Sequence, residues 1–180
     1  HWEVSRVKWA VTSIEQGWSP QCDAEPVEGP DQWGVLKVGC VNGGSFRATE
    51  NKALPADLEP VPELGLKVGD VLVSRANTRE LVGSAAVVPT DHPRLMLCDK
   101  LYRLRAAPDM VLPTFLAAFL QSQVAREIIE LEATGASSSM VNIGQSVILE
   151  MPIALPPIGE QEDILERVSG LGAQLDELSS

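Results

Sequence analysis

The chain has 180 residues, of which 44% are hydrophobic and 22% charged, which is typical of a soluble globular protein and predicts one domain with an appendage. Its longest apolar run, Met110 to Leu120, is too short to span a bilayer, and no basic-then-apolar leader opens the chain, so we expect a cytoplasmic protein without a membrane segment. The three cysteines and two histidines form no CxxC pair or ligand cluster, which predicts reduced thiols and no metal site.

The formal net charge is −11, from 14 basic and 25 acidic residues. This excess argues against a nucleic-acid-binding protein, because binding to phosphates draws on Lys and Arg. The charge is unevenly distributed, however: residues 67–105 carry seven basic residues against four acids, whereas residues 150–180 carry one against seven. This distribution suits a protein with one side for DNA and another for a different partner, although acidic proteins without such a role are common.

In chain order, the apolar residues from Trp2 to Val11 suit either a short strand or a helical turn. A break follows at residues 15–21, where Trp18 either anchors the loop to the core or belongs to a loop that reaches DNA. Residues 32–41 are predicted to form a strand, and Asn42, Gly43 and Gly44 a turn.

The clearest strand–turn–strand unit follows Gly69 and Asp70, with strands predicted over 71–74 and 81–88 and a polar loop, RANTRE, between them. Residues 95–97 and 101–104 are predicted to continue the same sheet. Pro113 is expected to open a helix of about 113–132 with one apolar stripe, because proline is tolerated at the first helical position.

Near the C-terminus, the apolar run 147–155 suits a buried strand that Pro156 and Pro157 terminate. A helix is expected from about residue 159, with acids in its first turn. Its apolar residues follow a heptad spacing of 4, 3, 4 and 3, which predicts a coiled-coil seam formed by Ile164, Val168, Leu171, Leu175 and Leu178.

The RANTRE loop, residues 75–80, is the best candidate for contact with DNA bases. Arg suits a bidentate contact with guanine and Asn with adenine, each worth about 1–3 kcal/mol of discrimination. Lys100, Arg103 and Arg105 suit contacts to phosphates. The polar loop before residue 147 adds further donors in Ser137, Ser138 and Asn142. Each group also has a simpler interpretation, as a solvated hairpin, sheet face or loop.

One catalytic pattern is present. Pro30-Asp31 followed by Glu50-Asn51-Lys52 has the form of a PD-ExK nuclease site, in which two carboxylates hold a divalent metal. Asp31 falls in a predicted turn and residues 50–52 in a hydrophilic loop, which disfavours this interpretation. The chain has no GxxxxGK[ST], GxSxG, HExxH or Asn-Pro-Pro-aromatic motif, so we expect it to do no covalent chemistry.

The run TGASSSMVNIGQSVILEMPIALPPIGEQEDIL (134–165) resembles the end of a target-recognition domain in the specificity subunits of type I restriction-modification systems. The similarity extends upstream through GDVLVSRANTRELVGSAAVV (69–88) and DKLYRLR (99–105).

The resemblance implies an α/β fold of the α+β type, with a curved, mostly antiparallel sheet, a packed helix and a C-terminal coiled-coil-type helix. Residues 1–155 would form the target-recognition domain and residues 156–180 the start of a conserved-region helix. The function implied is recognition of one half of a bipartite double-stranded DNA target. The chain would be non-catalytic and would direct a separate adenine methyltransferase subunit and a restriction subunit to that target.

S-adenosylmethionine and Mg²⁺ would then belong to those partners and not to this chain. The residues expected to contact DNA are Trp18, Ser19, Arg75, Asn77, Thr78, Arg79, Lys100, Arg103, Ser137, Ser138 and Asn142. The heptad residues would pack on a second recognition domain, on the methyltransferase or on a second copy of the chain. The alternatives are an interaction scaffold of the same fold that does not bind DNA, and a Mg²⁺-dependent nuclease.

Overall fold

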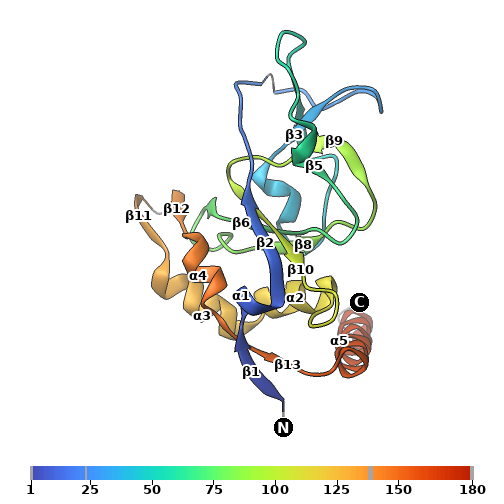
Figure 1. Ribbon diagram of the computed structural model, residues 1–180, viewed down its shortest axis with the longest axis vertical. Coiled ribbons are helices and arrows are strands. Elements are labelled where there is room, and N and C mark those ends of the chain that lie inside the picture. The colour runs from blue at the N-terminus through green and yellow to red at the C-terminus, as the bar shows by residue number, and fades with distance from the viewer. Residues whose placement is uncertain (1, 23, 138–139, 179–180) are drawn as a thin grey trace.

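The computed structural model describes residues 2–22, 24–137 and 140–178, with the backbone alone at 136–137 and 171–178. Strands β3, β5 and β9 lie toward one end of the molecule, followed by β2, β6, β8 and β10 and then by helices α2, α3 and α4, with β1 and β13 at the opposite end (Figure 1). Among the described strand pairs, one is parallel and the others are antiparallel, as predicted.

The N-terminal segment contains both structures that its apolar pattern suits. Strand β1 (Glu3–Arg6) leads into a helical turn, α1 (Val7–Ala10), and then into β2 (Val11–Gln16). Val7 and Ala10 are fully buried, because the short helix turns both side chains into the core.

A central antiparallel sheet has the strand order β2-β10-β6-β8. It is built from β6 (Val71–Ser74), β8 (Ala85–Val87) and β10 (Leu101–Ala106), together with β2. The predictions for residues 71–74 and 101–104 are confirmed. The returning strand predicted over 81–88 is wrong before residue 85, because the chain still turns at Gly83, whose φ is +84°.

The two faces of this sheet cover two separate cores, because neighbouring side chains on a strand point to opposite faces. The first core lies against the helices and takes Val71, Val73, Tyr102 and Leu104. The second core lies against the other large sheet and takes Leu72, Ala86 and Leu101.

That second four-stranded sheet has the order β4-β3-β9-β5. Its strands are β3 (Gly34–Leu36), β4 (Asn51–Ala53), β5 (Gly65–Leu66) and β9 (His92–Met96). The strand predicted over 32–41 is wrong beyond Leu36, where a 3-10 helix forms (Val38–Val41); another covers Pro62–Leu64. The expectation that residues 95–97 continue the central sheet is also wrong, because β9 pairs with β3 and β5.

The helix predicted over 113–132 is two helices, α2 (Pro113–Leu120) and α3 (Gln123–Glu132). Pro113 does open α2. The break comes from Ser122, whose hydroxyl accepts a hydrogen bond from the Ala125 amide and so caps α3. The single apolar stripe is therefore wrong in its second half, where Ala125 and Ile129 are buried and Val124 is 55% exposed.

The C-terminal part begins with β11 (Thr134–Ser137) and β12 (Met140–Asn142), which form a small sheet with β7 (Ala76–Asn77). The strand predicted over 147–155 is wrong in its first half. Helix α4 (Gln145–Leu149) buries Ile148 there, and only β13 (Pro152–Leu155) is extended, paired with β1.

Helix α5 (Ile158–Leu178) begins where the prolines end the strand, as expected. Gln161 anchors it: this fully buried side chain accepts from the Leu112 amide and donates to the carbonyls of Met110 and Pro156.

The heptad seam remains a prediction. Ile164 is half-buried and Val168 is 58% exposed, while Leu171, Leu175 and Leu178 lie outside the residues whose side chains are described. Within the described part of the chain, no helix has the length and apolarity needed to cross a membrane.

Candidate nucleic-acid interface

Four segments that are far apart in the sequence meet at one place on the surface. They are residues 17–19, 75–79, 99–100 and 140–143. The first joins the third through Asp99: the Ser19 hydroxyl donates to its carboxylate at 2.5 Å, and the side-chain Nε2 of the preceding Gln16 donates to its carbonyl at 3.1 Å. Trp18 packs partly buried against the second core, and its amide donates to the Leu97 carbonyl, so its ring anchors this loop.

Arg75 joins the other segments. Its Nε donates to the Tyr102 hydroxyl at 3.2 Å, its Nη1 donates to the Asp99 carbonyl at 3.2 Å, and the guanidinium lies 5.7 Å from the Tyr102 ring centroid. The Tyr102 hydroxyl donates in turn to the Ile143 carbonyl at 3.1 Å. Backbone hydrogen bonds from Arg75 to Lys100 and from Ile143 to Arg75 complete the connection.

Sequence analysis missed Tyr102. The available signal was that it is the only tyrosine of the chain and lies two residues after Lys100. It is 97% buried, and its ring faces the first core. Its hydroxyl accepts a hydrogen bond from Arg75, so the orientation of this arginine depends on a residue of the central sheet.

Asn77 lies on a strand instead of a free loop. Residues Ala76 and Asn77 form β7 and pair with Asn142 and Val141 of β12, which brings the RANTRE loop against the polar segment near residue 142. The Asn77 side chain is 8% exposed, donates to Asn42 at 3.3 Å and accepts from the Thr78 amide at 2.9 Å. In this conformation its amide holds the loop together and has little surface for a base.

The remaining predicted residues differ in how they are placed. Lys100 and Arg79 are exposed, and Arg79 makes a long hydrogen bond, 3.4 Å, to the Glu130 carbonyl. The Thr78 hydroxyl is buried and has no hydrogen-bond partner among the described residues. The backbone of Ser137 ends β11, and Ser138 lies outside the described residues.

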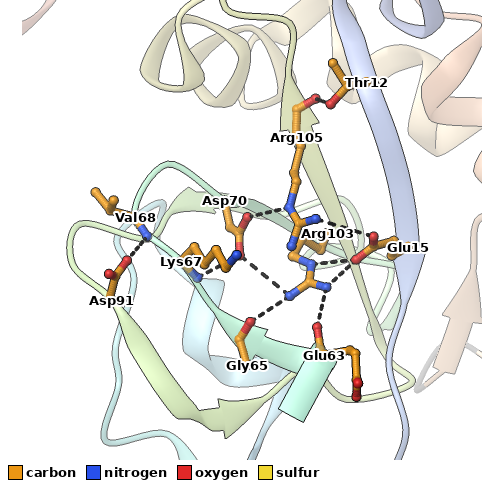
Figure 2. Close-up of polar contacts among 10 residues, drawn as sticks. All are labelled: Thr12, Glu15, Glu63, Gly65, Lys67, Val68, Asp70, Asp91, Arg103 and Arg105. Carbon is orange, nitrogen blue, oxygen red and sulfur yellow. Dashed lines mark hydrogen bonds and ion pairs between the residues drawn. The ribbon is translucent and has the colours of Figure 1, made fainter. Parts of the chain in front are cut away.

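The expectation that Arg103 contacts phosphate needs correction (Figure 2). Arg103 is 2% exposed and points into the space between the two large sheets. Its Nε donates to Glu15 at 2.8 Å, and its Nη2 also bonds that carboxylate. Nη1 and Nη2 donate to the Gly65 and Glu63 carbonyls at 2.9 and 3.0 Å. A guanidinium engaged on all its nitrogens and buried has no face left for DNA.

Arg105 joins the same network. Its Nε lies 3.3 Å from Asp70 Oδ1, and its Nη1 lies 3.7 Å from Glu15 Oε1. The side chain of Asp70 is 3% exposed, and its Oδ2 lies 3.7 Å from Arg103 Nη1. Two arginines and two carboxylates give a neutral cluster, which ties β2 and β10 of the central sheet to the 63–65 segment of the second sheet. Sequence pattern gave no sign of it, because the partners are 88 and 35 residues apart.

Part of the basic segment is therefore unavailable to a ligand. Arg103 and Arg105 are neutralised internally, and Arg94 pairs with Asp31 at 2.8 Å. Within residues 67–105, the basic side chains without a carboxylate partner among the described residues are Lys67, Arg75, Arg79 and Lys100. Arg75 and Lys100 lie at the meeting point of the four segments, with Arg79 at the end of one of them.

The nuclease pattern receives no support from this geometry. Asp31 is held by Arg94, and Lys52 lies on β4 and not in a loop as predicted. Over the described residues, no group of three or more His, Cys, Asp or Glu side chains is arranged to hold a metal ion.

No protein-family model matches the chain. The type I restriction enzyme EcoEI specificity subunit of Escherichia coli is 32% identical over 179 residues, which cover 99% of this chain and 30% of that protein. A chain from a structure of the type I restriction-modification system superposes with a TM-score of 0.67 at 21% identity, covering 98% of this chain and 40% of its own length.

The crystal structure of the HsdS subunit from Thermoanaerobacter tengcongensis superposes with a TM-score of 0.66 at 21% identity, covering 99% of this chain and 39% of that subunit. These two structures share the fold of the chain. The chain thus spans 30% of the curated relative's length and 39–40% of these two solved chains. It is a homologue, over nearly all of its own length, of part of a type I restriction enzyme specificity subunit.

Proposed function

We propose that this chain is a DNA-recognition domain that reads one half of a bipartite double-stranded target for a type I restriction-modification enzyme. The observation that carries the proposal is the meeting of four segments around Arg75, since all four contain residues that the sequence selects for DNA contact. The homology to specificity subunits over 99% of the chain supports the same conclusion.

Arg75 is the proposed base-reading residue. Its Nε and Nη1 are held by Tyr102 and the Asp99 carbonyl, and Nη2 makes no hydrogen bond to the described residues. With Nε and Nη1 held, the guanidinium presents its Nη2 in a fixed direction, which suits the hydrogen-bond acceptors of guanine. Asn77 and Thr78 shape the loop that carries it.

The proposed contacts to phosphates or sugars come from the segments that meet around Arg75, through Lys100, Arg79, Ser19 and Asn142. Such contacts position the domain without selecting a sequence. Ser137 and Ser138 stay proposed DNA contacts on the sequence alone. Trp18 contributes by anchoring the loop that carries Ser19.

The proposed partners follow from the relatives. A separate adenine methyltransferase subunit, which would carry S-adenosylmethionine, and a restriction subunit, which would use Mg²⁺, act at the site that this non-catalytic chain selects in the cytoplasm. The acidic helix α5 is the proposed contact with one of them, with a second recognition domain or with a second copy, through the seam at Ile164, Val168, Leu171, Leu175 and Leu178.

The test is a selection from randomised DNA duplexes with this chain mixed with its genomically adjacent methyltransferase subunit, at near-physiological salt. A retained motif of three to five fixed base pairs is expected, by analogy with a half-site. The competing function, a scaffold of the same fold, is favoured by the net charge of −11. The scaffold function would be supported if the two proteins associate but retain no DNA motif. The proposed DNA contacts would then be wrong.

A further inference from the structure

A pocket of about 310 Å³ lies beside the proposed interface, at the edge of the second sheet. Its walls come from the loop after β2, from β3 and β4, and from the turn before β10. The polar and charged part of its lining includes Ser19, Lys37, Lys52, Cys98, Asp99 and Lys100. Because Ser19 and Lys100 belong to both, the pocket is continuous with the surface around Arg75.

The charge of this pocket is opposite to that of the protein. Three of the chain's five lysines line it, Lys37, Lys52 and Lys100, in a chain whose net charge is −11. The one acid in the lining is Asp99, and its carboxylate already accepts a hydrogen bond from the Ser19 hydroxyl. The pocket therefore has a local excess of two positive charges.

The backbone holds these lysines in place. Lys52 lies on β4 opposite Val35 of β3, and the Lys37 amide donates to the Glu50 carbonyl at 2.8 Å. Lys100 precedes β10, and its carbonyl accepts from the Arg75 amide at 2.9 Å. None of the three ammonium groups has a carboxylate within ion-pair distance among the described residues.

Cys98 adds no negative charge. Its side chain is 3% exposed, and burial raises the pKa of the thiol to about 11, so the group stays neutral at physiological pH. An anion in the pocket would therefore meet three lysines, the Ser19 hydroxyl and a neutral thiol, with Asp99 as the one acid of the lining.

We propose that this pocket binds a phosphate group of the DNA backbone, with Lys37, Lys52 and Lys100 as its cations. The inference rests on the proposed function and extends the interface from the central sheet to the second sheet. Such a contact adds affinity for every sequence and fixes the direction in which the duplex crosses the domain, so that Arg75 meets a groove.

The test compares the unaltered chain with Lys37→Ala/Lys52→Ala in duplex binding, measured by fluorescence anisotropy from low to high salt. The slope of log K against log salt is expected to fall by up to about 0.9 in the double variant, because the contact with one phosphate, and the counterion release that goes with it, is lost. The base preference should not change. Lys67→Ala is the control, since this lysine is exposed, as Lys52 is, and lies outside the pocket. Lys52→Arg should retain most of the slope.

A slope in the double variant equal to that of the unaltered chain would overturn the proposal, as would an equal loss in Lys67→Ala. Heteronuclear NMR spectra of each variant, unchanged outside the pocket, would show that folding is intact.

Inorganic phosphate provides a separate arm. Amide shifts at residues 37, 52 and 100 on phosphate addition, lost in the double variant, are expected if the pocket is an anion site. If phosphate gives these shifts but the chain binds no duplex, both the DNA role of the pocket and the proposed function are wrong. The ligand of the pocket would then be a free phosphate compound. The absence of both responses would overturn the pocket itself.

Discussion

The Nε of Arg75 and the hydroxyl of Tyr102 lie 3.2 Å apart, and the guanidinium carbon lies 5.7 Å from the tyrosine ring centroid. An exposed arginine has many rotamers, and fixing one of them costs conformational entropy at the moment of binding. The contact with Tyr102 of β10 restricts the Arg75 rotamers when the chain folds, so less conformational entropy is lost when a ligand binds.

Tyr102→Phe tests this orientation directly. The ring and its contact with Arg75 remain, but the Ile143 carbonyl and Arg75 Nε each lose a partner, so the free energy of unfolding should fall by about 1–2 kcal/mol. The larger expected effect is a relaxed preference at one base pair in the duplex selection, with the rest of the motif intact. Urea unfolding separates the two effects. A motif unchanged at every position would show that Tyr102 is only a core residue.

Arg75→Ala and Lys100→Ala should differ in kind. The first is expected to remove about 1–3 kcal/mol of discrimination at one base pair, because a guanine loses its bidentate partner. The second should weaken binding to all sequences alike and reduce the salt slope by about one unit. Binding titrations with the selected motif and with single-base variants measure both. Identical behaviour of the two variants would contradict the division between specifying and positioning residues.

Arg103→Met should be the most destabilising of these changes, by about 3–5 kcal/mol in urea unfolding, because it removes the buried cation from Asp70 and Glu15, leaves the Gly65 and Glu63 carbonyls without a donor, and keeps only the half-exposed Arg105 as a partner of the two acids. Arg94→Met is the control: it breaks an exposed pair with Asp31 and should cost less than about 1 kcal/mol. Equal costs would mean that the buried network does not hold the two sheets together.

Stability should fall in alkali through the buried thiols. Burial raises the pKa of Cys98 from about 9 to about 11, and it also raises that of Cys40. Below pH 9 the Cys98 thiol is protonated in both folded and unfolded chains. Between about pH 9 and 11 only the unfolded chain loses the proton, so it binds fewer protons and becomes favoured.

The measurement is urea unfolding at several pH values from 7 to 11, under reducing conditions. Cys98→Ala should unfold more easily at every pH, because it leaves a cavity, but it should lose less additional stability above pH 9 than the unaltered chain. A parallel decline in the two proteins would show that Cys98 does not contribute to the pH dependence.

Local sequence signals were sufficient to predict several elements. Pro113 opens a helix, Pro156 and Pro157 end a strand before another helix, and residues 71–74 and 101–104 are strands, because each depends on the conformational preferences of a few adjacent residues. The same holds for the selection of the RANTRE loop and its polar neighbours as candidates, since residue type alone suggests which side chains suit bases and phosphates.

The environment of each of those residues depends on long-range contacts. Arg103 and Lys100 look alike in the sequence, but the first is buried against Glu15 and Asp70 while the second is exposed. Asn77 is placed on a strand by a partner near residue 141, and Lys37 and Lys52 reach the same pocket as Lys100 through the pairing of β3 with β4. The physical reason is that burial and pairing are set by residues tens of positions away, which no local pattern contains.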